Sequence, residues 1–150
     1  MKQNTQAKRI EPKLNVQTFT DRLRYAIRDG SAEVYLQKDR LIDRKRNKLY
    51  TNRHTLGALF PDEDETTVLQ RELLTLSADN YIETLEDVRF KNRSPWWVFG
   101  KNYQGRDVYI KLRVELVSSD KSKAGTHIFV MSFHYSDRKF SDSSFPYQRK

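Results

Sequence analysis

The 150-residue sequence contains no cysteine, which excludes disulfide bonds, thiolate zinc sites and cysteine nucleophiles. It has only five glycines and neither a GxxxxGK[ST] nor a GxGxxG segment, so the phosphate-cradling loops of nucleotide-binding proteins are missing. No apolar run approaches the ~18 residues that span a bilayer, and the polar N-terminus lacks the apolar core of a secretory signal. We therefore expect a soluble, cytoplasmic protein with no membrane contact and no cofactor.

A metal site is not expected either. The three histidines, His54, His127 and His134, lack zinc-binding spacing, and no HExxH segment occurs. The acidic run at residues 62–65 could be taken for a metal cluster. Its position at a predicted helix start favours capping, because carboxylates there complement the positive end of the helix dipole.

Positive charge is in excess. Lysine and arginine number 28 against 20 aspartates and glutamates, which gives a net charge of +8, so the natural partner is expected to be RNA, DNA or an acidic protein. Basic residues are densest in 38–53, where the RNA-binding candidates are Arg44, Lys45, Arg46 and Lys48. Such a run is either a phosphate-facing surface or an ordinary solvated face.

The order of predicted elements indicates an α+β fold. Residues 1–13 are expected to form a basic, flexible arm, and residues 14–150 a single domain. Apolar spacing predicts a helix from Val16 to Ile27 that stops at Gly30. Further helices are expected after Pro61 and over 78–85, followed by an antiparallel sheet of at least three strands. The predicted strand segments are 32–36, 96–103, 106–116 and 127–134.

The strongest strand signal lies in residues 106–116. Its alternation places Val108, Ile110, Leu112, Val114 and Leu116 on one side, and Tyr109, Lys111, Arg113 and Glu115 on the other. In the next strand, the bulky residues Phe129, Met131 and Phe133 are the better core candidates. That choice places His134 on the same open face as Tyr109 and Lys111.

These open-face residues have the groups needed to cleave RNA. The reaction requires a base for the attacking 2′-hydroxyl, cations for the phosphoryl oxygens and an acid for the leaving 5′-oxygen. His134 can serve as acid or base near neutral pH. Lys111 and Arg113 can hold the phosphate, while Tyr109 can orient the reacting groups or stack on a base.

Two of these assignments have simpler alternatives. Tyr109, Lys111, Arg113 and His134 can equally be ordinary exposed sheet residues. Tryptophans 96 and 97 begin a strand, where they belong either to the core or, in the case of Trp97, to an RNA-stacking surface.

Three segments in succession resemble the MqsR family of toxin–antitoxin toxins, which cleave messenger RNA. They are Leu76-Ser77-Ala78-Asp79-Asn80-Tyr81, then Trp97 with Gly105-Arg106-Asp107 and Val108-Tyr109-Ile110-Lys111, then Val130-Met131-Ser132-Phe133-His134. The closing Phe145-Pro146-Tyr147 resembles the tail of the family's longer branch. The match covers about residues 55–147.

The resemblance implies a RelE-like fold, with a small antiparallel sheet packed against two to three helices. It implies a metal-independent endoribonuclease that cleaves mRNA, inhibits translation, is neutralised by a cognate antitoxin and meets DNA only through that antitoxin. Tyr109 falls on the family's tyrosine, and His134 falls where the founding branch has lysine. Glu83 and Val98 depart from a family lysine and a family glutamine. Lys111, Arg113 or the Arg44–Lys48 cluster could compensate for these changes.

Two other interpretations stay open. The chain could be a non-catalytic module of the same fold that binds nucleic acid or an acidic protein, such as an inhibitor encoded by a mobile element. It could also be a DNA-binding regulator, which the basic segment 38–53 supports although no clear helix-turn-helix is present. Covalent cleavage of RNA distinguishes the endoribonuclease toxin from both of these interpretations.

Overall fold

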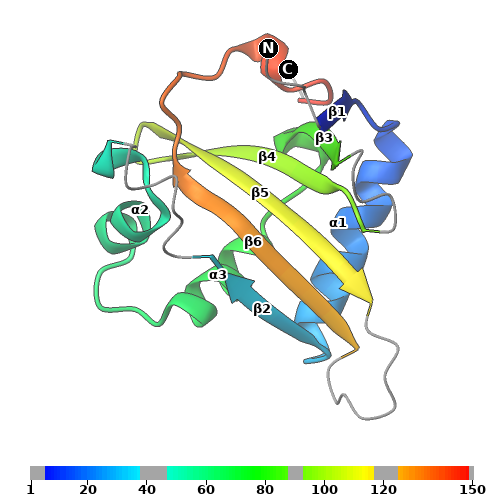
Figure 1. The fold of residues 1–150 in the computed structure, drawn as a ribbon, viewed down its shortest axis with the longest axis horizontal. Helices are drawn as coiled ribbons and strands as arrows, with labels where there is room; N and C mark the ends of the chain where they lie inside the picture. The colour runs from blue at the N-terminus through cyan, green and yellow to red at the C-terminus, as the bar shows by residue number, and fades with distance from the viewer. Residues whose placement is uncertain (1–5, 38–46, 88–92, 117–124, 149–150) are drawn as a thin grey trace.

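A computed structural model describes residues 6–37, 47–87, 93–116 and 125–148. Its six strands form one sheet in the order β1-β3-β4-β5-β6-β2, and Figure 1 shows α1 and α3 behind that sheet. The strands are β1 (Gln6–Arg9), β2 (Ala32–Leu36), β3 (Tyr81–Asp87), β4 (Trp96–Tyr103), β5 (Arg106–Leu116) and β6 (Thr126–Tyr135). The helices of the described part are α1 (Lys13–Arg28), α2 (Asn52–Leu59) and α3 (Glu65–Leu73).

The sheet is mostly antiparallel. Only β2 and β6 run parallel, and the other four strand pairs are antiparallel. Parallel pairing requires a crossover connection, and here the long segment between β2 and β6 contains the helices α2 and α3. The α+β class expected from the sequence is confirmed.

Both of the longer predicted helices form, with the ends that their sequences indicate. Helix α1 buries Val16 and Leu23 and ends before Gly30, which adopts φ +78° where other residues are strained. Helix α3 is capped by Asp64, whose side chain accepts a hydrogen bond from the N–H of Thr67 at 3.0 Å. The capping role expected for the acidic run therefore applies to Asp64.

Two local expectations differ from the structure. Residues 6–9 of the expected flexible arm form β1, which pairs with β3 and is joined to it by an ion pair between Lys8 and Glu83 at 3.6 Å. The helix expected over 78–85 is a single 3₁₀ turn, Ala78–Asn80, that leads into β3. A bulge between Tyr81 and Glu83 interrupts the two-residue alternation of β3, so the sequence does not show a regular strand pattern there.

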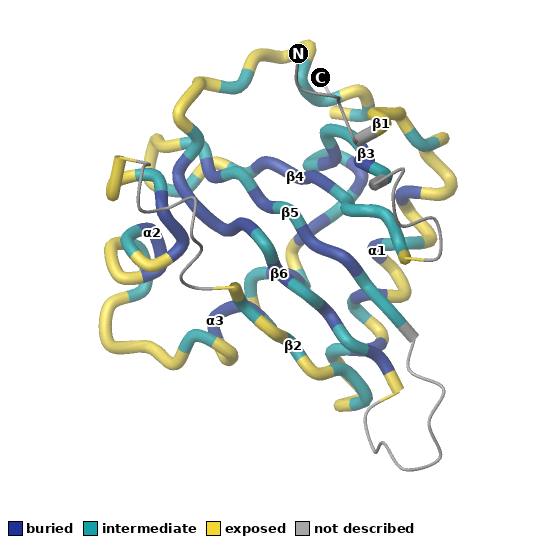
Figure 2. The backbone as a smooth tube through the Cα atoms, in the orientation of Figure 1, coloured by how far each residue is buried: buried dark blue, intermediate teal, exposed yellow. Residues whose placement is uncertain are grey.

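The core lies between the sheet and the helices. Its largest fully buried side chains include Tyr81, Phe99, Phe133, Leu23 and Leu69, and Figure 2 shows buried positions along the central strands. The opposite side of the sheet, here called the outer face, is partly crossed by the segment that follows β6. Phe140 from that segment lies against Gly100 of β4, where an added Cβ would meet the ring at 2.6 Å.

Candidate functional site on the outer face of the sheet

The alternation predicted for β5 is confirmed. Val108, Ile110 and Leu112 are fully buried in the core, so Tyr109 and Lys111 between them face the outer side. Each of these residues has a direct neighbour on β6, because Tyr109 pairs with His134 and Lys111 pairs with Ser132.

A β-bulge in β6 sets which of its residues reach the outer face. Lys111 pairs with Ser132, whereas the next residue, Leu112, pairs with Val130, so Met131 is the extra residue. Before the bulge Ile128 and Val130 enter the core, and after it Phe133 does so. The core assignment was therefore right for Phe133 and wrong for Phe129 and Met131, neither of which belongs to the core.

Helix α2 holds this bulge in place through buried side-chain hydrogen bonds. The Asn52 amide donates to the carbonyl oxygens of Gln37 at 2.8 Å and Met131 at 2.9 Å, and its own oxygen accepts from the N–H of Phe133 at 2.9 Å. Thr55 accepts from the N–H of Tyr135 at 2.8 Å. Beyond the end of β2, side chains of α2 thus take the place of a neighbouring strand and hydrogen-bond to the backbone of β6.

Tyr109 and His134 form a stacked pair on the outer face. Their ring centroids are 5.7 Å apart with an angle of 24° between the planes. His134 is 8% exposed, and its Nδ1 lies 2.9 Å from the carbonyl oxygen of Tyr135. A carbonyl can only accept, so Nδ1 donates in this bond, and Nε2 of the neutral ring is the nitrogen that accepts a proton.

Two cations of β5 on the same face lie close to the ring of Trp96. Lys111 Nζ is 5.7 Å from the centroid of the Trp96 ring, and the Arg113 guanidinium carbon is 4.0 Å from it. Arg113 is only 5% exposed and lies 3.9 Å from Glu115. Lys111 is therefore the better placed of the two cations to meet a phosphate, while Arg113 is largely packed into the face.

Of the other predicted site residues, Trp97 does not join this group. Trp97 lies on the opposite side of the sheet, stacked on Phe19 of α1 with ring centroids 4.1 Å apart, and Trp96 takes the outer position instead. Lys48 is exposed in a 3₁₀ turn, Lys48–Tyr50, that precedes α2. Arg44, Lys45 and Arg46 lie outside the described residues.

The two positions that depart from the MqsR pattern lie close to the site. Val98 pairs with Lys111 and is fully buried. Glu83 pairs with Val98 and forms the ion pair with Lys8. The valine side chain can neither donate nor accept a proton or a hydrogen bond, so Val98 takes no direct part in chemistry at this site.

Comparison with known proteins adds no relative. No protein-family model, curated protein or solved structure matches this chain. Within the described residues, no helix is long and apolar enough to cross a membrane. In the same part of the chain, no three histidine, aspartate or glutamate side chains are grouped so that they could hold a metal ion.

Proposed function

We propose that this protein is a metal-independent endoribonuclease whose active site is the Tyr109–His134 pair with Lys111. The observation that carries the proposal is the cross-strand pairing of Tyr109 with His134, with their ring centroids 5.7 Å apart and Lys111 two residues further along β5 on the same face. A base, a hydroxyl and a cation are then available within one small area of the sheet.

The chemistry follows from the roles that these groups can take. Nε2 of His134 removes the proton from a ribose 2′-hydroxyl, and the resulting oxygen attacks the adjacent phosphorus. The bond from phosphorus to the 5′-oxygen breaks, that oxygen takes a proton from water, and His134 returns its proton to the solvent. The products are a 2′,3′-cyclic phosphate and a 5′-hydroxyl. Lys111 stabilises the charge that develops on the phosphoryl oxygens, and the Tyr109 hydroxyl orients the phosphate.

The biological role that we propose follows the MqsR resemblance. The substrate is messenger RNA, cleavage inhibits translation in the cytoplasm, and a cognate antitoxin protein neutralises the enzyme. An antitoxin that covers the outer face would block the proposed site directly. The net charge of +8 favours an acidic segment in such a partner.

One observation favours a second function, a non-catalytic RNA-binding or acidic-protein-binding module. Val98 and Glu83 replace the glutamine and lysine of the family, and both are committed to other contacts, Val98 in a buried position and Glu83 in its ion pair with Lys8. In that case Lys111 and Tyr109 contribute affinity only.

The test is a cleavage assay on mixed-sequence RNA in excess chelator, with Lys139→Ala as the control because Lys139 is exposed. We expect cleavage by the parent protein and by Lys139→Ala, and at least ~100-fold slower cleavage by His134→Ala, because a positioned acid–base group contributes about 10²–10⁴-fold. RNA that binds but stays intact with the parent protein supports the binding module instead.

A further inference from the structure

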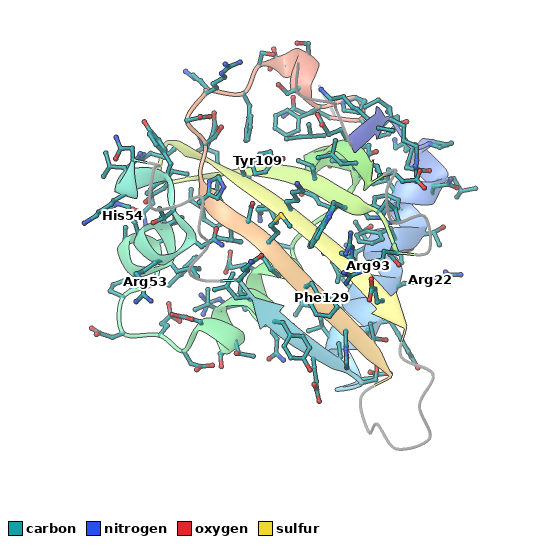
Figure 3. All side chains as sticks on the ribbon, viewed as in Figure 1. Arg22, Arg53, His54, Arg93, Tyr109 and Phe129 are labelled. Atoms are coloured by element: carbon teal, nitrogen blue, oxygen red, sulfur yellow. The ribbon has the colours of Figure 1, made fainter. Side chains whose placement is uncertain are left out.

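A row of planar side chains crosses the outer face beside the proposed active site. Arg113 of β5 pairs with Phe129 of β6, and Phe129 pairs with Tyr35 of β2. Trp97 pairs with Leu112, so Trp96 comes opposite Arg113 on the outer side. The aromatic row, defined as Trp96, Arg113, Phe129 and Tyr35, therefore spans four adjacent strands. Figure 3 labels Phe129 of this row, and Tyr109 farther along the sheet.

The members of the row form two pairs, each in contact through flat faces. The Arg113 guanidinium lies over Trp96 at 4.0 Å, and the rings of Tyr35 and Phe129 are stacked with centroids 5.4 Å apart and an angle of 20° between them. The His127 ring packs edge-on against both rings, with its centroid 5.3 Å from that of Tyr35 and 6.0 Å from that of Phe129. These contacts fix the orientation of the Tyr35 and Phe129 rings and of the Arg113 guanidinium.

The rings of the row are partly exposed to solvent and lie on the side of the sheet opposite the core. Tyr35 is 42% exposed, and Phe129 and His127 are half-buried. None of the three belongs to the buried core cluster, which lies on the helix side of the sheet. Cross-strand aromatic pairing stabilises a sheet modestly, but it does not require the rings to be exposed.

Charge around the row separates a phosphate side from a carboxylate side. Lys111 lies two residues before Arg113 on β5, toward the active site. Glu115 and Glu33 lie on the other side of the row, where both pair with His127 of β6. Glu115 is also held by Arg93 at 3.3 Å. A polyanion is therefore attracted along the Lys111 side and repelled from the Glu33 side.

We propose that single-stranded RNA lies across this face with its backbone along Lys111 and its unpaired bases stacked on Phe129 and Tyr35. The inference rests on the proposed function, because it describes how the substrate of that site is held. Sequence-specific RNA-binding sheets stack two or three unpaired bases on aromatic side chains, whereas the bases of a duplex are already stacked on each other. The aromatic row thus selects single-stranded over double-stranded RNA.

The test measures binding apart from cleavage. Fluorescence anisotropy follows the titration of a labelled, 2′-O-methylated single-stranded RNA, which lacks the attacking hydroxyl, with the parent protein, Phe129→Leu and Tyr35→Leu. Leucine keeps apolar volume and removes the ring face. Tyr25→Leu is the matched control, because Tyr25 is 70% exposed on α1. Thermal melting of each variant shows that it is folded.

We expect Phe129→Leu and Tyr35→Leu each to weaken binding by about 5- to 100-fold, as loss of one stacked base does, while Tyr25→Leu binds like the parent. Duplex RNA of the same sequence should bind more weakly than the single strand. Equal affinity in Phe129→Leu and the parent, or equal affinity for duplex, would overturn the proposal. A third result is also informative. If Phe129→Leu loses binding but the parent protein never cleaves unmodified RNA, the aromatic row binds RNA and the proposed catalysis is wrong.

The same anisotropy assay also tests whether the face binds an acidic peptide instead of RNA. If an unlabelled acidic peptide displaces the RNA, and RNA binding shows no dependence on Phe129 or Tyr35, the row is not a base-stacking surface. If RNA binding depends on both rings, displacement by the peptide shows only that the two ligands share the Lys111 side.

Discussion

The side-chain oxygen of Asn52 accepts a 2.9 Å hydrogen bond from the N–H of Phe133, two residues beyond the bulged Met131. The same amide donates to the Met131 carbonyl oxygen at 2.9 Å, so one side chain satisfies both backbone groups that flank Ser132. Without the bulge, the alternation that buries Ile128 and Val130 would place His134 in the core. The position of the proposed catalytic histidine therefore depends on Asn52.

Substitution of Asn52 by alanine should destabilise the protein. It leaves the Phe133 N–H and the carbonyl oxygens of Met131 and Gln37 without their side-chain partner, and each buried unsatisfied group costs about 1–3 kcal/mol. We expect a loss of at least about 2 kcal/mol in the free energy of unfolding, measured by urea denaturation. Asn15→Ala at an exposed position should stay within about 0.5 kcal/mol of the parent. A parent-like midpoint for Asn52→Ala would show that the bulge is stable without this side chain.

Gly100→Ala should displace the segment that follows β6. The new Cβ would lie 2.6 Å from the Phe140 ring and 3.0 Å from Ile82, distances that require the ring to move. Overpacking of this kind costs about 1–3 kcal/mol. Gly57→Ala is the matched control, because nothing lies within 4 Å of its Cβ position and alanine favours a helix. Thermal melting should show a lower Tm for Gly100→Ala and an equal or higher Tm for Gly57→Ala.

Tyr103 should make the free energy of unfolding decrease at alkaline pH. Burial, together with the 2.8 Å hydrogen bond that its hydroxyl donates to Glu72, raises the pKa of Tyr103 above its usual value. A raised pKa in the folded state contributes stability that is complete below the unfolded pKa of ~10 and is lost as pH rises toward the folded value. Urea denaturation at pH 9 to 12 should therefore show that the free energy of unfolding falls more steeply with pH for the parent than for Tyr103→Phe. Parallel pH profiles would mean that Tyr103 ionises as easily in the folded state as in the unfolded one.

Lys111→Ala should reduce cleavage of RNA more than it reduces binding. If Lys111 stabilises charge that develops in the transition state, its removal lowers kcat by about 10²–10³-fold, and Lys111→Arg restores part of the rate. The exposed Lys139 serves as the control, with kcat unchanged in Lys139→Ala. Undiminished kcat in Lys111→Ala would assign Lys111 to binding alone.

The sequence predicted those features that depend on local pattern. The alternation of β5 identified the outer-face residues Tyr109 and Lys111. The acidic run at 62–65 identified the start of α3. These elements follow from side-chain periodicity and from backbone preferences, which a single sequence displays.

Features that depend on distant partners could not be predicted. The pairing of β1 with β3 uses backbone groups, which no side-chain pattern reports. Asn52 stands within a basic run and gives no sign that it is buried against β6. Phe129 was assigned to the core by its size, because the bulge at Met131, which reverses the facing of the strand, arises from the contact with α2. The aromatic row was missed for the same reason.

The most direct test of the account is the incubation of pure parent protein and His134→Ala with mixed-sequence RNA in excess chelator. The account predicts fragments that end in 2′,3′-cyclic phosphate and 5′-hydroxyl from the parent, and at least ~100-fold slower cleavage by the variant. Intact RNA with the parent protein, or equal cleavage by the parent and the variant, would contradict the assignment of His134 and Tyr109 as the active site.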